Sequence, residues 1–279
     1  MRRRVTANLF KAFLLVGVLV ALAGGIGWLI GNERSAALFA FCSLLAAIAV
    51  YWVGDRTLLG MLGARPFALA EDPLLRSATD RLAATLQIAP PALALIDDGF
   101  PRAFVVGRGP GSSTLAVSTG LLRAIRREEL EALIAHELVH VKTLDVLTQT
   151  FAVLLSTTLV EMSRIGGFLA RSLLYVLGPI GAAFTHVLLS PKREYFADRE
   201  AARIANPHDL ADALLRLDHA GELVAFAASP TTEPLYCVDP FERDRLSRMF
   251  RTHPPLADRV ARLRGMGAAD DETGEPTVG

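Results

Sequence analysis

Two long stretches without a charged side chain lie near the start of the chain and limit what it can fold into. Residues 12–30 and 36–54 contain no Asp, Glu, Lys or Arg, and the polar loop 32–35 separates them. A helix of nineteen residues is about 28 Å long, close to the ~30 Å hydrocarbon core of a bilayer. Hydrophobic residues make up 52% of the chain, more than an ordinary soluble domain of this length contains. The sequence therefore predicts a helical hairpin that spans a membrane.

A cleaved signal peptide is the alternative interpretation of the first stretch. Three basic residues, Arg2 to Arg4, precede it, and Ala21-Leu22-Ala23 resembles a cleavage site. The apolar run continues to Ile30, however, and a second uncharged stretch follows directly. Both features favour the membrane hairpin.

A second hydrophobic region lies in the middle of the chain. Residues 146–160 are apolar with some Thr and Ser, and residues 172–190 contain His186 but no Asp, Glu, Lys or Arg. We expect two further membrane helices here, which brings the total to about four. The first stretch is short for a full span, so a hydrophobic wall beside a cleft is the alternative.

The remaining segments predict one soluble α+β domain that the second hydrophobic region interrupts. A helix is expected from Asp72 to Gln87, followed by strands at 92–96, 103–106 and 114–118 that form a small antiparallel sheet. Further helices are expected at 207–227, 240–250 and 254–265. The predicted organisation is a membrane hairpin (1–58), the first part of the domain (59–145), a second hydrophobic hairpin (146–190), the second part of the domain (191–267) and a disordered tail (268–279).

Residues 136–140 read His-Glu-Leu-Val-His. Apolar residues at three- and four-residue steps, without Pro or Gly, predict a helix from Glu128 to Asp145. Positions i and i+4 share one face of a helix, so His136 and His140 can bind one metal ion. Glu137 beside them can act as the general base that takes a proton from water. The pattern predicts metal-assisted hydrolysis; the alternative is a helix that contains two histidines by chance.

A catalytic zinc site usually has three protein ligands, so a third ligand is needed. Residues 141–146 contain no His at the spacing of the metzincins. The helical stretch 192–202 carries Glu194 and Asp198 on one face, where Glu194 can bind zinc and Asp198 can hold a ligating imidazole through its second nitrogen. Acidic residues on such helices are often only solvated, and the pair alone leaves that alternative open.

Basic residues are distributed unequally around the predicted spans. Nine flank one side: Arg2, Arg3, Arg4, Lys11, Arg56, Arg65, Lys142, Lys192 and Arg193. Three flank the other: Arg34, Arg164 and Arg171. By the positive-inside rule, we expect a multi-pass protein of the cell inner (plasma) membrane with both termini and the zinc site in the cytoplasm.

The paired motifs resemble those of the HtpX-type membrane zinc metallopeptidases, relatives of the endopeptidases that process CAAX proteins. The specific part is His136-Glu137-x-x-His140 followed at a distance by Glu194-x-x-x-Asp198, and the resemblance covers nearly the whole chain. It implies a mainly α-helical, gluzincin-like catalytic domain. It also implies that His136, His140 and Glu194 bind one Zn2+ per chain, that Glu137 is the general base and that Asp198 supports a ligand.

Other positions match the family outside the zinc motifs. Asp145 follows the second His by five residues, and Thr252-His253-Pro254 and Arg259 stand where the family places groups that contact substrate. The resemblance implies that Asp145 supports the site and that His253 is the first candidate for stabilising the oxyanion. Tyr195 is a weaker candidate, because on a helix it points about 100° away from its neighbour Glu194. Helix capping or packing is the alternative for His253 and Arg259.

One segment departs from the family pattern. On a strand that borders the cleft the family has Asn-Ala-Phe or a similar tripeptide, and this chain has Arg102, Ala103 and Phe104. We expect these residues to contact substrate without the polar contact that Asn would make. Arg127 likewise replaces the Ser or Thr expected as N-cap of the zinc-binding helix, at a cost of about 1 kcal/mol.

One function is favoured over two others. It is an integral-membrane zinc endopeptidase that hydrolyses protein or peptide substrates on the cytoplasmic side, and the resemblance implies quality control of misfolded or damaged membrane proteins. The alternatives are a membrane-bound signalling metalloprotease that cuts one dedicated partner and a noncatalytic scaffold that binds zinc. CAAX processing is disfavoured, because the related endopeptidases have more spans than the four expected here.

Cysteine content and charge argue against other classes of protein. Cys42 lies in a predicted span and Cys237 in a soluble segment, so neither a disulfide framework nor a thiolate zinc site is expected. The formal net charge is zero and no basic stripe carries interleaved aromatic residues, so no nucleic-acid partner is expected. The sequence does not predict an oligomeric state.

Overall fold

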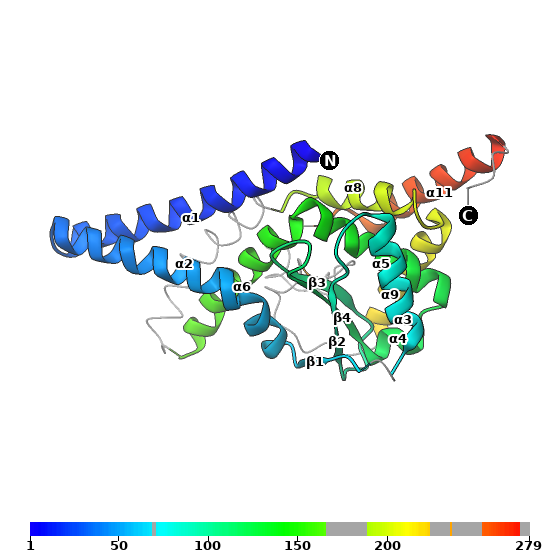
Figure 1. The fold of residues 1–279 in the computed structure, drawn as a ribbon, viewed down its shortest axis with the longest axis horizontal. Helices are drawn as coiled ribbons and strands as arrows, with labels where there is room; N and C mark the ends of the chain where they lie inside the picture. Colours follow the sequence, from blue (N-terminus) through cyan, green and yellow to red (C-terminus); the bar gives the residue numbers. More distant parts are fainter. Residues whose placement is uncertain (69–70, 166–188, 224–234, 236–252, 274–279) are drawn as a thin grey trace.

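The computed structural model describes residues 1–68, 71–165, 189–223, 235 and 253–273 (Figure 1). A long helical hairpin projects from a domain in which helices surround a small sheet (Figure 1). The elements are α1 (Arg2–Ile30), α2 (Glu33–Met61), β1 (Ala64–Pro66), α3 (Pro73–Thr85), β2 (Ala92–Ile96), β3 (Ala103–Gly107), β4 (Ser113–Ser118), α4 (Thr119–Ala124), α5 (Arg127–Thr143), α6 (Asp145–Ile165), α8 (Lys192–Ala201), α9 (Pro207–Leu223) and α11 (Leu256–Thr273).

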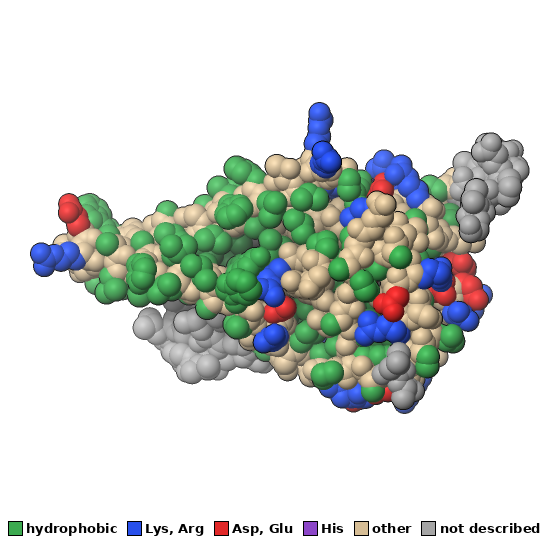
Figure 2. Space-filling view, in the orientation of Figure 1, with side chains coloured by type: hydrophobic (Ala, Val, Ile, Leu, Met, Phe, Trp, Pro, Cys, Tyr) green, Lys and Arg blue, Asp and Glu red, His purple; other side chains and the backbone are tan. Residues whose placement is uncertain are grey.

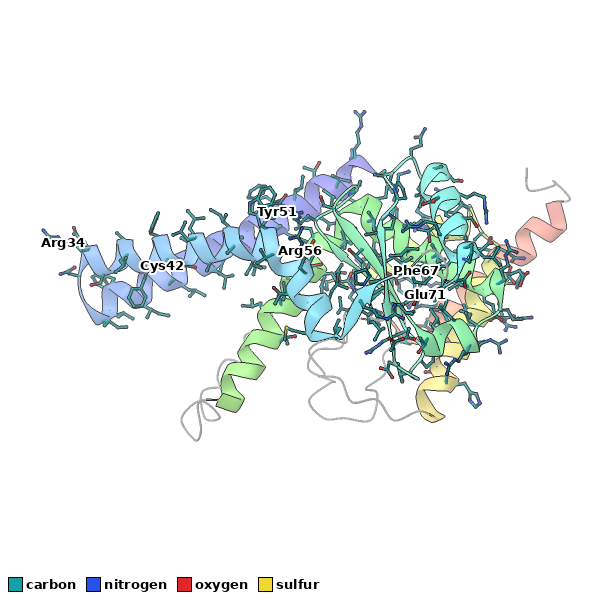
Figure 3. All side chains as sticks on the ribbon, turned by 60° about the horizontal axis from the view of Figure 1, so that its bottom comes forward. Arg34, Cys42, Tyr51, Arg56, Phe67 and Glu71 are labelled. Carbon is teal, nitrogen blue, oxygen red and sulfur yellow. The ribbon has the colours of Figure 1, made fainter. Side chains whose placement is uncertain are left out.

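The predicted N-terminal hairpin is formed by α1 and α2. The Asn32 side chain caps α2 by accepting the backbone N–H of Arg34 at 2.9 Å. Gly27 lets the helices approach closely, since a Cβ there would lie 2.6 Å from the carbonyl oxygen of Ser35. Arg34 lies at the far tip of the hairpin and Arg56 near the domain (Figure 3). Apolar side chains cover the surface of both helices (Figure 2), as a lipid environment requires.

The expected count of about four membrane helices is not confirmed. Among the described residues, α1 and α2 are long and apolar enough to cross a membrane, and a third span results only if α5 and α6 are counted together. These two helices meet at an angle of 90°. Leu144 between them has a left-handed backbone, with φ of 61°, so the chain turns sharply instead of continuing the zinc-binding helix. Most of the predicted span at 172–190 lies outside the described residues.

The sheet is mixed, so the prediction of an antiparallel sheet is wrong in one pairing. Its strand order is β1-β2-β4-β3, with β2 parallel to β4 and the other two pairings antiparallel. The loop 97–102 crosses the end of β4, where Ser118 Oγ donates to the carbonyl of Phe100 (2.7 Å) and accepts the N–H of Arg102 (3.0 Å). This crossing places β3 on the far side of β4. Both β2 and β4 then run opposite to β3 and therefore parallel to each other.

Both faces of the sheet are covered, which explains why its strands lack polar alternation. One face packs Leu95, Val105 and Leu115 against α3 and α5. The other face packs Phe104 and Val106, with further residues of the sheet, against α2 and α6. The sheet thus joins the hairpin to the helices that carry the predicted zinc ligands.

Several predicted helix ends differ from the structure. The Asp72 side chain caps α3, as expected, and α3 ends at Thr85. α9 covers Pro207–Leu223 of the helix predicted at 207–227, and residues 224–227 and the helix predicted at 240–250 lie outside the described residues. α11 continues to Thr273, so the first residues of the tail predicted to be disordered are helical. The two alanines 268 and 269 have the highest helix propensity and prolong the helix.

Candidate metal centre

The predicted zinc-binding helix is α5, and its N-terminus is stabilised without a Ser or Thr N-cap. Arg126 is the N-cap, one residue before the expected Arg127. The fully buried carboxylate of Glu129 accepts the backbone N–H of Arg126 at 3.0 Å and two N–H groups of Arg216 from α9 at 2.8 and 3.0 Å. These bonds fix the start of the helix against α9.

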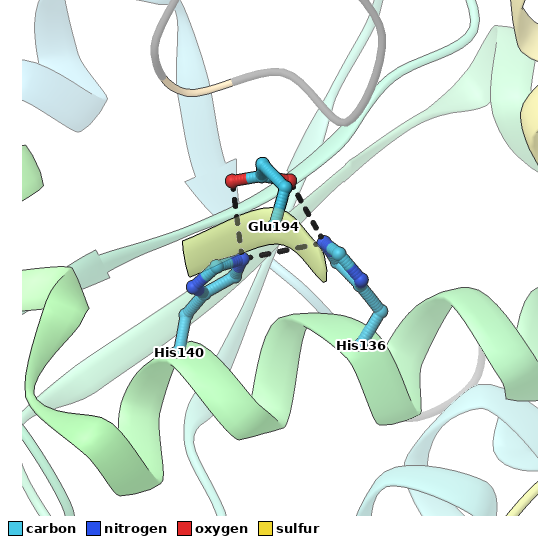
Figure 4. Close-up of side chains that lie close together, drawn as sticks. All are labelled: His136, His140 and Glu194. Atoms are coloured by element: carbon cyan, nitrogen blue, oxygen red, sulfur yellow. Dashed lines mark hydrogen bonds and ion pairs between the residues drawn. The ribbon is translucent and has the colours of Figure 1, made fainter. Parts of the chain in front are cut away.

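His136, His140 and Glu194 converge on one point, the two histidines from α5 and the glutamate from α8 (Figure 4). The two Nε2 atoms are 3.2 Å apart. Oε2 of Glu194 is 3.4 Å from Nε2 of His136, and Oε1 is 3.6 Å from Nε2 of His140. Zinc bonds of about 2.0–2.2 Å in a tetrahedron put neighbouring ligand atoms about 3.3–3.6 Å apart. The two Nε2 atoms therefore have the spacing of neighbouring zinc ligands, and each lies at a similar distance from one oxygen of Glu194.

The chemistry of this cluster also fits a cation. All three side chains are buried, and Oε2 of Glu194 lies 3.4 Å from Nε2 of His136 and 3.6 Å from Nη1 of Arg259, without a hydrogen bond of ordinary length among the described residues. A buried carboxylate oxygen without a short hydrogen bond is costly unless a cation satisfies it. Two imidazoles and one carboxylate are a donor set of catalytic zinc sites, which leave the fourth position open.

A carboxylate supports each of the two histidines. Asp198 Oδ1 lies 3.0 Å from Nδ1 of His136, and Asp145 Oδ2 lies 3.4 Å from Nδ1 of His140. Such contacts fix the orientation of a ligating ring and make Nε2 the metal-binding atom. In the metal-free cluster burial lowers the pKa of His136, but Asp198 and Glu194 outweigh burial and raise it to about 9.

Arg259 of α11 holds Asp198 in place. Its Nε and Nη2 donate to the two carboxylate oxygens at 2.8 and 2.7 Å, and only 1% of the arginine side chain is exposed. Burial raises the pKa of Asp198, but Arg259 and His136 together outweigh burial and lower this pKa to about 2. The structure therefore places Arg259 against a support of the metal site, a contact different from the predicted one with substrate.

Glu194 lies among positive groups. Its Oε1 is 3.2 Å from Nε of Arg193 and 3.8 Å from Nε2 of His253. Burial alone would raise the pKa of Glu194, but His253 and Arg193 outweigh burial and lower it well below its usual value. Glu194 is thus held as a carboxylate. The structure also brings the predicted His253 to the cluster.

The predicted general base Glu137 is held by the edge of the sheet. Its Oε2 accepts the backbone N–H of Val105 in β3 at 3.0 Å. Two residues along, the N–H of Gly107 donates to Oγ1 of Thr150 in α6 at 3.1 Å. The outer edge of β3 therefore faces α5 and α6. A peptide that adds to this edge must replace these contacts.

The other residues predicted to contact substrate make contacts within the protein. The ring of Tyr195 packs under the guanidinium of Arg262, 4.0 Å from its centroid. Arg102 is buried and donates to Asp98 at 2.7 Å. Ala103 and Phe104 are 2% and 0% exposed and pack in the core, so their side chains support the strand from within.

Among the described residues, several that contact the site were not predicted as site residues, including Val105, Arg193 and Asn8. Val105 acts through its backbone N–H, for which a sequence carries no signal. Arg193 precedes Glu194 directly and was assigned only to the basic flank of a span. Asn8 is a polar residue that becomes buried in α1 and donates to Asp145 at 2.6 Å. An amide at the start of an apolar helix was the one available signal.

Comparisons with known proteins agree with this geometry. Residues 69–267 match the model of peptidase family M48. The chain is 36% identical to a protease HtpX homolog of Acidiphilium cryptum (strain JF-5), over 94% of this chain and 98% of that protein. It is also 36% identical to a protease HtpX homolog of Pyrococcus abyssi (strain GE5 / Orsay), over 90% and 93%.

A solved structure shares the fold. The crystal structure of S. mikatae Ste24p superposes with a TM-score of 0.51 at 17% identity, covering 94% of this chain and 66% of that chain. The likeness at this identity concerns the fold alone. The family match and the identities over nearly full length decide the assignment: the chain belongs to the HtpX proteases of peptidase family M48 and is a metallopeptidase.

Proposed function

We propose that this chain is an integral-membrane zinc endopeptidase that cuts membrane proteins on the cytoplasmic side, in the quality control of misfolded or damaged proteins. The observation that carries the proposal is the buried cluster of His136, His140 and Glu194 beside Glu137, whose possible ligand atoms all lie within 4.8 Å of one another. One Zn2+ per chain would bind there, with His136, His140 and Glu194 as ligands. When bound, zinc supplies a Lewis acid that lowers the pKa of water and polarises a peptide carbonyl.

The side chains around the cluster would then perform the proton transfers. Glu137 follows the ligand His136, and the Val105 N–H fixes its carboxylate. Glu137 would take the proton of the attacking water and pass it to the leaving amine. His253, 3.8 Å from Glu194, would donate to the developing oxyanion, and the backbone of β3 would align an extended peptide.

The substrate class and orientation rest on the membrane helices. α1 and α2 have the length and composition of spans, and the nine-to-three distribution of basic residues supports a cytoplasmic site. A tethered site of this kind meets proteins of the same membrane at high local concentration. The family resemblance supports a role in quality control.

Zinc content and casein cleavage of the detergent-purified full chain test the enzymatic part. Wild type is expected to hold about one zinc and to cut casein. Glu137→Gln should hold zinc without cutting, and Glu194→Ala should lose the metal. Glu128→Gln, an exposed change on the same helix, is the control and should behave as wild type. If Glu194→Ala keeps both zinc and activity, the proposed ligand set is wrong.

A further inference from the structure

Asn8 of α1 lies before the uncharged stretch 12–30. Its side chain is 6% exposed, whereas most of α1 faces outward. Nδ2 donates to the backbone carbonyl of Thr143 at 2.9 Å and to Oδ1 of Asp145 at 2.6 Å. These two acceptors lie 135 and 137 residues further along the chain. A single amide thus joins the candidate membrane hairpin to the corner between α5 and α6.

Both acceptors belong to the support of a metal ligand. Thr143 is the last residue of α5, where helix carbonyls lack partners within the helix. The other carboxylate oxygen of Asp145, Oδ2, lies 3.4 Å from Nδ1 of His140. The same oxygen accepts a hydrogen bond from the hydroxyl of Thr143 at 2.9 Å. Asn8 therefore fixes one oxygen of a carboxylate whose other oxygen faces the ligating imidazole. Asn8 thus contacts Asp145, and Asp145 in turn contacts His140.

The same end of α1 contacts the helix that carries the third ligand. The guanidinium of Arg4 lies over the ring of Phe196 in α8, 3.9 Å from its centroid. Phe196 stands two residues after Glu194. The N-terminal end of α1 lies beside α8 in Figure 1. The first turns of α1 therefore touch both elements that supply ligands.

We propose that Asn8 is a positioning residue of the metal site, and that the N-terminal turns of α1 form part of that site as well as of a membrane anchor. The proposal rests on the proposed function, because it assumes that the cluster binds zinc. Asn8 touches neither the ligand atoms nor the fourth position. It acts by holding Asp145 in the orientation that presents Nε2 of His140. Groups that orient ligands directly change metal affinity about 10- to 100-fold, so a group one contact further out should change it less, about 3- to 10-fold.

The test uses the full chain in lipid nanodiscs. Zinc affinity is measured by chelator competition for wild type, Asn8→Ala and Thr6→Ala, and the visible spectrum of the Co2+-loaded proteins reports ligand geometry. Thr6 is the matched control, since it is exposed on the same helix and its hydroxyl bonds only to the Arg2 carbonyl. Asn8→Ala should bind zinc about 3- to 10-fold more weakly with an altered Co2+ spectrum. Thr6→Ala should match wild type.

A double-mutant cycle separates positioning from simple docking of α1. If Asn8 acts through Asp145, Asn8→Ala should cause no further loss of affinity in an Asp145→Ala background. An equal further loss there, or unchanged affinity and spectrum of Asn8→Ala, overturns the inference while the proposed function stands. Wild type without zinc overturns both. Asn8→Ser keeps one hydrogen-bond donor, so its zinc affinity should fall between those of wild type and Asn8→Ala. If Asn8→Ala does not fold, the zinc affinity of Asn8→Ser tests the inference in its place.

Discussion

Replacing Arg259 by Met should destabilise the protein strongly, because it removes one member of a buried ion pair. The side chain is 1% exposed, donates two hydrogen bonds to Asp198, and places Nη1 3.6 Å from Oε2 of Glu194. Breaking such a pair leaves an uncompensated buried charge and costs about 3–5 kcal/mol. The pKa of Asp198 points the same way, because Arg259 and His136 together lower it from 3.8 to about 2 against the opposing effect of burial, which corresponds to roughly 2 kcal/mol for both partners. We expect a loss of about 2–4 kcal/mol.

The pH dependence of this loss has a definite sign. An aspartate with a lowered pKa adds stability above its unfolded value of 3.8, and this stability disappears as the pH falls toward about 2. Metal-free wild type and Arg259→Met should therefore differ fully at neutral pH and converge below pH 4. In thermal melting at pH 7, each kcal/mol corresponds to roughly 2–4 °C for a chain of this size. The zinc affinity should also fall, by about tenfold or more, because Asp198 orients His136.

Two further variants separate charge pairing from packing. Arg262→Met is the control, because Arg262 is exposed on the same helix and packs on the Tyr195 ring; it should change stability by less than about 1 kcal/mol. Arg259→Met with Asp198→Asn removes both charges, so stability should largely recover while zinc affinity stays low. The reasoning is refuted if Arg259→Met melts at the wild-type temperature at pH 7, or if its deficit persists unchanged at pH 3.

Three other changes test separate parts of the site. Chelation with EDTA should abolish casein cleavage, and one equivalent of zinc should restore it; cleavage that survives complete removal of the metal contradicts the proposed mechanism. Val105→Pro removes the N–H that holds Glu137, and this N–H is not one that bonds to β4. Turnover should therefore fall about tenfold at unchanged zinc content. Turnover equal to that of wild type would show that this N–H is dispensable. Glu129→Ala removes the acceptor of four hydrogen bonds and should cost about 2–3 kcal/mol of stability, with unchanged cleavage per zinc-loaded molecule at low temperature. An unchanged melting temperature would contradict the capping role.

The ligand pair within α5 could be predicted from the sequence, because spacing within one helix decides which side chains share a face. The candidate third ligand needed a long-range contact that no local pattern gives, and Glu194 was predicted from its partner Asp198 and from the family resemblance. The contact of Arg259 with Asp198 could not be predicted from the sequence. A lone arginine on an amphipathic helix looks solvated, and only the packing of α11 on α8 shows that it is buried against Asp198.

The errors in the fold have related causes. Strand positions follow from local composition, but the pairing of β2 with β4 depends on where the loop 97–102 crosses, which Ser118 determines through tertiary hydrogen bonds. The continuous apolar runs of the strands did carry a usable signal, since they are typical of a sheet covered on both faces. The break between α5 and α6 has no Gly or Pro, and Leu144 adopts its left-handed conformation because the surrounding helices impose it.

The order of the elements ties the metal site to the candidate membrane segments. α6 begins two residues after α5 ends, packs on α1, α2 and β3, and supplies Asp145 behind His140. α1 reaches the same corner through Asn8, and its Arg4 contacts α8. A shift of α1 relative to α6 would therefore first displace Asp145, which supports His140, and would move the candidate ligands only through it. On the proposed function, this connection makes metal affinity sensitive to how the hairpin is seated in its surroundings. Zinc binding of wild type should thus differ between detergent and nanodiscs, and Asn8→Ala should reduce that difference.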